Sequence, residues 1–290
     1  MRIVLVGALG EVGRSLRCAL TDHGNEVVPV SSRANVADSA VLSLDAAVRF
    51  VASSAPDLVV HAGGRGDKRT GERDALHASR LMGQACERGG IRGVLISTVR
   101  VLEDSPGSIP GSAVPECHSD YARANAANEQ EWLEAAPSQG YVVRLANYFC
   151  APASADSPQT QLLPWSLVTE ALDSGRINVR SAPTVKREFV AAQDAATAIR
   201  TVASASDPAR FSSTTPGHSV DLRQLTNLVG DAFEVTGRMR PAVTFGEDAS
   251  SGPTLQSDWL AAHGWCCTLA DEEVMNVIAG WLSEHHSKKQ

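Results

Sequence analysis

The stretch RIVLVGALGEVG, Arg2–Gly13, decides the fold. Its first half is a run of apolar, largely β-branched residues, which is typical of a strand buried on both faces. Glycines recur at three-residue spacing in its second half, at Gly7, Gly10 and Gly13. The apolar residues that follow fall on one face of a helix; they are Val12, Leu16, Ala19 and Leu20. The stretch therefore predicts a strand, a tight turn and an amphipathic helix in succession.

Further apolar runs of the same kind follow along the chain, with helical patterns between them. They are EVVPVS (Glu26–Ser31), DLVVHA (Asp57–Ala62), IRGVLIS (Ile91–Ser97) and YVVRLA (Tyr141–Ala146). Such continuous runs suit parallel strands, because helices cover both faces of a parallel sheet. The alternation predicts an α/β protein with a Rossmann-type, doubly wound parallel sheet.

The glycine turn is the strongest local indication of a function. Glycines between a strand and a helix let the backbone approach a pyrophosphate, and the helix N-terminus offers unpaired N–H groups and a positive dipole end. A tight β–α turn without a ligand is the alternative interpretation. The first strand and the amphipathic helix favour a dinucleotide. Its expected contacts here are Gly7, Gly10, Glu11, Val12 and Gly13.

The residues around the second strand bear on which dinucleotide would bind. NAD favours an acidic residue at the end of that strand, where it would accept hydrogen bonds from the ribose hydroxyls. This chain instead has Ser32 and Arg33 there, and Arg14 directly follows the glycine motif. Guanidinium groups and hydroxyls suit an additional 2′-phosphate, so the sequence predicts NADP, with NAD as the alternative. Solvated surface arginines would explain the same pattern.

The regular rhythm of strands and helices weakens after Asn147, where prolines and serines indicate loops and short pieces. Further on, REFVAAQDAATAIRTVA (Arg187–Ala203) is typical of a strand followed by a helix. We expect this segment to return to the first domain. The predicted division is a dinucleotide-binding domain of residues 1–150 with 187–204, and a smaller C-terminal substrate-binding lobe of residues 151–186 and 205–290.

Several motifs stand in order along the chain: GALGEVG, DLVVHAGG, ISTVRVL, SDYARAN, VVRLAN and KREFVAAQDAATAI. Together they resemble the extended short-chain dehydrogenases/reductases, in the NAD-dependent epimerase/dehydratase family. Within that family, the resemblance is to the proteins that modify nucleotide sugars, which include dTDP-4-dehydrorhamnose reductase-like proteins. The resemblance implies an NADP(H)-dependent oxidoreductase or epimerase acting on a nucleotide-linked sugar or a similar carbonyl or polyol compound. It also implies a homodimer formed through helices of the first domain.

The resemblance assigns roles to individual residues. Tyr121 would exchange a proton with a substrate hydroxyl or carbonyl group, and Thr98 would hydrogen-bond the same oxygen. Asn147 and Arg187 match positions that meet the diphosphate of a nucleotide sugar, which suits a forked guanidinium. The structural alternatives are a strand-end cap for Thr98, a turn former for Asn147 and a surface ion pair for Arg187. Positions along the cofactor are matched by Leu44, Asp45, Ala62 and Gly63.

Asn125 departs from the family pattern, which has a lysine four residues after the tyrosine. A free tyrosine has a pKa of about 10, so it acts as a base near neutrality only beside a positive charge or strong hydrogen bonds. Asn125 can bond a ribose hydroxyl or a water, but it is neutral. The loop after the third strand offers Arg65, Lys68 and Arg69 as substitute cations, although a surface charge run explains this loop equally well.

The missing lysine leaves other functions open. A neutral phenol can still donate a proton, so the loss should harm carbonyl reduction less than oxidation. A non-redox lyase, cyclase or isomerase would not need the lysine, and neither would a non-catalytic NADP-binding sensor or partner protein. The presence of Thr98 and Tyr121 together argues against a sensor.

Composition narrows the classes of partner. The formal net charge is −7 and the basic residues are scattered, so no nucleic-acid footprint is present. No stretch approaches the roughly 20 apolar residues of a membrane span. The six cysteines form no CxxC pair, and no HExxH motif occurs. We therefore expect a cytoplasmic protein with reduced thiols, no metal and a small-molecule substrate.

Overall fold

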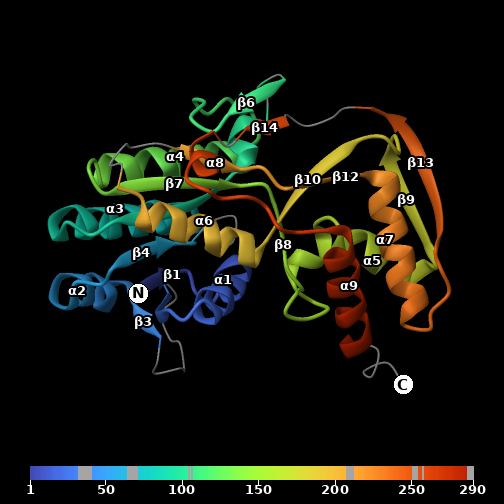
Figure 1. Ribbon diagram of the computed structural model, residues 1–290, viewed down its shortest axis with the longest axis horizontal. Coiled ribbons are helices and arrows are strands. Elements are labelled where there is room, and N and C mark those ends of the chain that lie inside the picture. The colour runs from blue at the N-terminus through green and yellow to red at the C-terminus, as the bar shows by residue number, and fades with distance from the viewer. Residues whose placement is uncertain are drawn as a thin grey trace. The chain divides into compact units, whose positions relative to one another are not determined.

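A parallel sheet organises the N-terminal part of the computed structural model (Figure 1). The structure describes residues 1–31, 41–63, 71–103, 105, 107–206, 212–249, 254–256 and 258–285. Within these ranges the sheet has seven strands, in the order β11-β7-β5-β4-β1-β2-β3. Their bounds are β1 (Arg2–Val6), β2 (Glu26–Ser31), β3 (Leu42–Ser43), β4 (Leu58–His61), β5 (Gly93–Thr98), β7 (Gly140–Leu145) and β11 (Ser212–Thr215). All pairings are parallel, which confirms the predicted Rossmann-type sheet.

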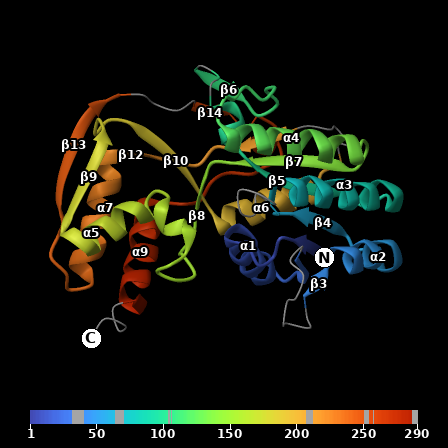
Figure 2. The same ribbon diagram turned by 180° about the vertical axis from the view of Figure 1, so that it is seen from behind.

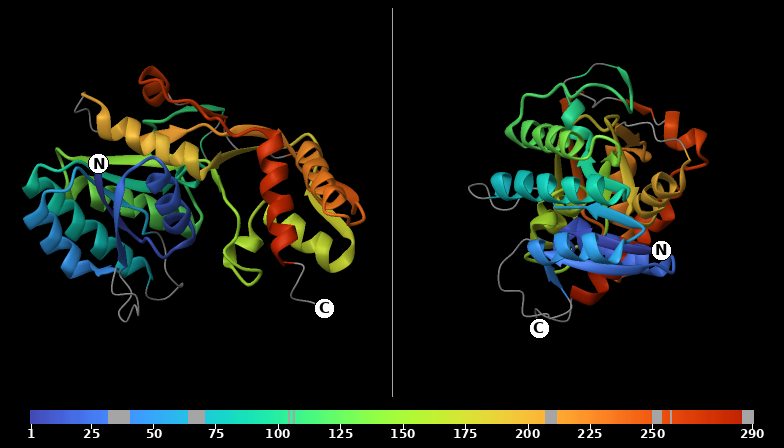
Figure 3. Two further views of the ribbon diagram at one scale, coloured as in Figure 1. Left: turned by 60° about the horizontal axis from the view of Figure 1, so that its bottom comes forward. Right: turned by 90° about the vertical axis from the view of Figure 1, so that its left-hand side faces the viewer.

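Helices cover both faces of this sheet (Figure 3). On one face α1 (Glu11–Asp22) packs against α6 (Ala192–Ser204). On the other face α2 (Leu44–Ser54), α3 (Gly71–Gly89) and α4 (Asp120–Ala135) follow one another, as Figure 2 shows from behind. The double coverage explains the continuous apolar runs, because strand side chains on both faces are removed from water.

Buried side chains of the helices and strands pack together on both faces of the sheet. Ile3, Val4 and Leu5 on β1 are fully buried, and each such side chain contributes about 1.5–3 kcal/mol to folding. On the face of α2, α3 and α4 the core includes Ala47, Val51, Met82, Cys86 and Trp132. The amphipathic face predicted for the first helix is also buried at Leu16, Ala19 and Leu20.

The described chain divides into two compact units. The first comprises Met1–Ala146, Ala192–Pro216 and Pro253–Cys266, and the second Asn147–Ala191, Gly217–Gly252 and Cys267–Gln290. These bounds differ from the predicted ones. Of the segment 187–204, only α6 lies in the first unit, because β10 (Lys186–Ala191) pairs with strands of the second unit.

The second unit has small sheets and helices around an aromatic core. β10 pairs in parallel with β8 (Asn147–Phe149) and antiparallel with β12 (His218–Asp221), and β9 (Arg176–Ser181) pairs with β13 (Ala242–Asp248). The helices are α5 (Trp165–Ser174), α7 (Leu222–Val235) and α9 (Asp271–His285). In the core, Trp165 stacks on Phe149 at 5.9 Å between ring centroids and contacts Trp281 at 5.5 Å.

Short elements complete the described chain. The 3₁₀ turn η1 (Val99–Leu102) follows β5, and η2 (Pro158–Gln161) precedes α5. In the first unit β6 (Ser108–Pro110) pairs with β14 (Thr254–Gln256), which α8 (Asp258–Ala262) follows. None of the helices in the described ranges is long and apolar enough to span a bilayer.

Candidate active site

The glycine turn lies where the order of strands in the sheet reverses, between β1 and β4. Gly7 has φ +82°, a conformation that glycine adopts without strain. A Cβ on Gly7 would lie 2.6 Å from the backbone nitrogen of Gly63, which follows β4, and one on Gly13 would lie 2.0 Å from the Gly7 carbonyl oxygen. The turns after β1 and β4 therefore touch, and they do so at the point where open α/β sheets bind ligands.

The N-terminus of α1 carries no side-chain cap. Gly10 is the N-cap residue, and its own N–H donates to the Gly7 carbonyl at 2.9 Å. The N–H groups of the first turn have no carbonyl acceptor inside an α-helix. In α1 they belong to Glu11, Val12 and Gly13. With the positive dipole end of the helix, they fit a pyrophosphate.

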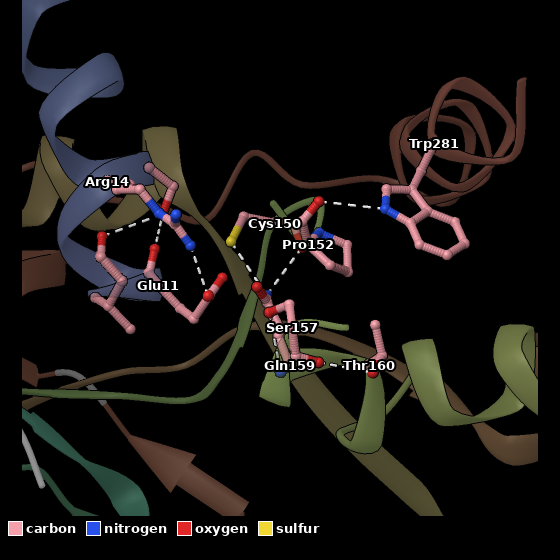
Figure 4. A network of polar contacts seen from close by, with 10 residues as sticks. Glu11, Arg14, Cys150, Pro152, Ser157, Gln159, Thr160 and Trp281 are labelled. Carbon is pink, nitrogen blue, oxygen red and sulfur yellow. Dashed lines mark hydrogen bonds and ion pairs between the residues drawn. The ribbon is translucent and has the colours of Figure 1, made fainter. Parts of the chain in front are cut away.

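Arg14 is paired before any ligand binds. Its Nη2 lies 2.6 Å from Glu11 Oε1, and both side chains are partly exposed (Figure 4). An exposed pair of this kind contributes at most about 1 kcal/mol, so a phosphate could displace Glu11. The pair gives Arg14 a partner within its own helix. Ser32 and Arg33, the other predicted contacts of such a phosphate, lie outside the described residues.

The other predicted cofactor positions lie at the ends of β3 and β4. Leu44 begins α2 and packs on the core, and Asp45 is exposed in the first turn, where the helix dipole favours a carboxylate. Ala62 donates its N–H to the Val6 carbonyl at 2.9 Å, which ties the end of β4 to β1. Gly63 continues that turn.

The side chain of His61 holds the turn at Gly63 by a hydrogen bond to its backbone. It is completely buried at the end of β4, and its Nδ1 accepts the Gly63 N–H at 2.9 Å. The ring packs edge-on against Trp132, with 5.8 Å between ring centroids. Burial lowers the pKa of His61 to about 4, so the imidazole is neutral near neutrality. His61 is thus a structural residue that holds the backbone of a predicted cofactor contact.

We expect this histidine to make the protein sensitive to acid. Unfolded histidine has a pKa near 6.5, so between about pH 6.5 and pH 4 the unfolded chain binds a proton that the folded chain does not. The free energy of unfolding should fall by about 3 kcal/mol as the pH falls through this window. Urea unfolding at several pH values measures it. His61→Gln should lose this slope, and exposed His263→Gln should keep it; equal slopes in both variants would refute the assignment.

The predicted catalytic residues lie on neighbouring elements of the first unit. Thr98 ends β5 and caps η1, because its Oγ1 accepts the Arg100 N–H at 3.2 Å. Tyr121 is 40% exposed in the first turn of α4, which packs against β5 and η1. The cap is the structural alternative for Thr98, yet it leaves the hydroxyl proton available to donate.

Asn125 bonds within its own helix. Its amide nitrogen donates to the Tyr121 carbonyl at 2.8 Å. This bond uses one of the two N–H donors of the amide, so it does not decide the contact with ribose or water that we predicted. Arg65, Lys68 and Arg69, which could replace the missing charge, lie outside the described residues.

A buried ion pair between α4 and β7 is a feature that sequence reasoning missed. Arg144 on β7 and Glu129 on α4 are 2% and 3% exposed, with Nη2 and Oε2 2.7 Å apart. Arg144 Nη1 also donates to the Ala113 carbonyl at 2.7 Å, in the loop that leads to α4. The sequence did hold a sign of this pair, because Arg144 lies inside the apolar run YVVRLA, where a charged side chain needs a buried partner.

The predicted substrate contacts Asn147 and Arg187 lie on paired strands of the second unit. Asn147 stands opposite Phe189 in the β8–β10 register, and its amide donates to the Glu188 carbonyl at 2.8 Å. Arg187 Nη1 donates to the Lys186 carbonyl at 2.8 Å. Asn147 therefore ties two strands together, which agrees with a structural role.

In the second unit, Gln159 forms another buried polar network (Figure 4). It is 5% exposed, and its Nε2 donates to the carbonyl oxygen of Cys150 at 2.9 Å and to its Sγ at 3.1 Å. Sequence reasoning missed this glutamine, which has no distinguishing spacing. Among the described residues, no three His, Cys, Asp or Glu side chains gather as metal ligands would.

The parallel sheet and the glycine turn at its switch point define a Rossmann-type α/β protein. The chain belongs to the NAD dependent epimerase/dehydratase family, whose model matches residues 3–211. No curated protein sequence matches the chain significantly.

Solved structures resemble the chain over almost its whole length. MoeE5 in complex with UDP-glucose and NAD has a TM-score of 0.74 at 19% identity, covering 98% of this chain and 99% of that one. dTDP-glucose 4,6-dehydratase from Bacillus anthracis in complex with NAD has a TM-score of 0.75 at 12% identity, and the match covers 99% of this chain and 98% of that one. L-threonine dehydrogenase from Phytophthora infestans has a TM-score of 0.76 at 14% identity, and the match covers 98% of this chain and 99% of that one. At such identities the likeness establishes the fold alone.

Proposed function

We propose that the protein is an NADP(H)-dependent oxidoreductase or epimerase that acts on a nucleotide-linked sugar or a similar carbonyl or polyol compound. The observation that carries the proposal is the contact between the Gly7 and Gly63 turns beside the uncapped N-terminus of α1. Family membership and the UDP-glucose and NAD held by MoeE5 support it. NAD is the alternative cofactor.

The residues of the first unit suggest how the site would work. A nicotinamide dinucleotide supplies hydride transfer when it is bound. The glycine turn and the first N–H groups of α1 would hold its diphosphate. In carbonyl reduction the Tyr121 phenol would donate a proton to the substrate oxygen, and the Thr98 hydroxyl would hydrogen-bond the same atom. Asn147 and Arg187, which belong to the second unit, are the contacts that we propose for the substrate diphosphate.

The state of Asn125 favours reduction over oxidation. Its amide is engaged with the Tyr121 carbonyl, and it brings no positive charge to the phenol. Proton donation needs no such charge, whereas stabilising a phenolate does. The same observation keeps a non-redox lyase, cyclase or isomerase as the second candidate function.

Cofactor binding tests the proposal. We expect NADPH to bind more tightly than NADH, because Arg14 can exchange Glu11 for a 2′-phosphate. Arg14→Gln should lower NADPH affinity about tenfold, as expected for one charged hydrogen bond, and leave NADH affinity unchanged. Fluorescence titration of the purified protein measures both affinities.

The outcomes separate the parts of the proposal. Equal affinities, unchanged in Arg14→Gln, would overturn only the preference for NADP. Absence of binding to either dinucleotide would overturn the redox function. Tight binding without turnover on a panel of keto-sugar nucleotides would favour the non-redox or sensor alternatives.

A further inference from the structure

A path of hydrogen bonds joins the turn capped by Thr98 to the start of α4. Thr98 Oγ1 accepts the Arg100 N–H, and the Arg100 guanidinium binds Glu103 Oε2 at 2.7 Å from Nε and 2.5 Å from Nη2. The other carboxylate oxygen of Glu103, Oε1, accepts the backbone N–H of Ser119 at 3.1 Å. Glu103 therefore links the η1 turn to the residue that precedes α4.

Ser119 sets where α4 begins. It is the N-cap residue, and its side chain accepts the Ala122 N–H at 3.2 Å. Caps of this kind contribute about 1 kcal/mol to a helix, and a carboxylate before the N-terminus is also favoured by the dipole. Because Tyr121 lies two residues after Ser119, a shift of Ser119 would move the phenol.

The surroundings of Glu103 favour an ionised carboxylate that accepts hydrogen bonds, and not a proton donor. Partial burial opposes its ionisation, but hydrogen bonds from Ser119 and Arg100 outweigh this effect and lower its pKa. The carboxylate thus stays ionised near neutrality. Both of its oxygens are engaged, by residues on different elements.

The loop between Glu103 and Ser119 has anchors of its own. β6 in this loop pairs with β14 (Figure 1), and the Glu116 N–H donates to the Val101 carbonyl at 2.9 Å. Arg144 holds the Ala113 carbonyl at 2.7 Å. Loss of the Glu103 side chain should therefore loosen the first turn of α4 without unfolding the loop.

We propose that Glu103 is a positioning residue that holds Tyr121 in a fixed place relative to Thr98. The inference rests on the proposed function, in which these two residues act on one substrate oxygen. Glu103 touches neither the substrate nor the reacting atoms; it acts through Ser119 on one side and Arg100 on the other.

Glu103→Ala tests this proposal by two independent measurements. Amide hydrogen exchange in the first turn of α4, residues 119–122, should become about tenfold faster, since the Ser119 N–H loses its acceptor. In carbonyl reduction, kcat should fall about 10–100-fold, as expected for a misplaced catalytic group, with KM and NADPH affinity within about twofold. Glu103→Gln keeps an oxygen for the Ser119 N–H and should restore most of kcat.

Glu131→Ala is the matched control. Glu131 also lies on α4 and also pairs with an arginine, Arg80, at 2.6 Å, but it lies near the other end of the helix. The Glu131→Ala substitution, like Glu103→Ala, removes one negative charge and one ion pair with an arginine. Neither exchange at residues 119–122 nor kcat should change in this variant.

Each outcome decides the proposal. Unchanged exchange at residues 119–122 in Glu103→Ala would show that Glu103 does not hold α4. Faster exchange with an unchanged kcat would overturn the link to catalysis. If the wild-type protein turns over none of the keto-sugar nucleotides, the proposed function fails and the catalytic role fails with it, while the exchange result still decides whether Glu103 braces the helix.

Discussion

Glu129→Ala is expected to lower the free energy of unfolding by about 3–5 kcal/mol, because it leaves the Arg144 guanidinium buried without its counter-charge. This is a large share of the roughly 5–15 kcal/mol that stabilises a typical domain. Urea unfolding at neutral pH, followed by circular dichroism, measures the change. Proteolysis of the loop before α4 should also become faster, because Arg144 holds its Ala113 carbonyl.

The geometry explains the size of this effect. Arg144 is 2% exposed, and its Nε and Nη2 both bond the Glu129 carboxylate, at 3.0 and 2.7 Å. Without Glu129, only the carbonyls of the loop remain as acceptors, and neutral acceptors do not balance a buried charge. The cost comes from the stranded guanidinium and exceeds the net contribution of the intact pair.

Two further variants test this explanation. Glu131→Ala, two residues along the same helix, removes an ion pair that is partly exposed and should cost at most about 1 kcal/mol. Combining Glu129→Leu with Arg144→Met removes both buried charges and should recover most of the lost stability. Equal losses for Glu129→Ala and Glu131→Ala would contradict the buried-charge argument.

The central sheet could be predicted because its strands are buried on both faces. That burial makes each run continuously apolar, and the predicted runs agree with β1, β2, β4, β5 and β7 to within a few residues. The partnership of Glu129 with Arg144 could not be predicted. The residues lie 15 positions apart on different elements, and only the packing of α4 on the sheet brings them together.

The second unit was underestimated for a local reason. We interpreted its prolines as marks of loops, but Pro164 is the N-cap of α5, a place where a proline costs the helix nothing. The strands β8 and β12 have only three and four residues, which is too short for a sequence period to be recognised. These short strands and the helix that begins at a proline were not predicted, and neither were the longer helices α7 and α9.

The candidate site was predictable where the signal is local. Gly7 and Gly63 were both expected to contact the cofactor, but their contact with each other depends on the adjacency of β1 and β4, which chain order does not reveal. The bond from Asn125 to the Tyr121 carbonyl is a local i−4 interaction that asparagine commonly makes, and it could have been anticipated.

The largest functional effect is expected for Tyr121→Phe. Under the proposed function, removal of the phenolic hydroxyl takes away the proton donor, so kcat for carbonyl reduction should fall about 10²–10⁴-fold. NADPH affinity should change little, because the variant keeps the ring and leaves intact the glycine turn and the first N–H groups of α1, which would hold the diphosphate. Steady-state oxidation of NADPH with a keto-sugar nucleotide measures kcat, and fluorescence titration measures the affinity.

Tyr141→Phe provides the control for loss of a hydroxyl in the same unit. Tyr141 is buried on β7 beneath the Arg92 guanidinium and has no assigned role in the reaction, so this variant should keep its turnover within about twofold. An unchanged kcat in Tyr121→Phe would mean that the proton comes from another group. Asn125→Lys places a positive charge near the phenol, which favours its ionised form, so it should raise the rate of alcohol oxidation.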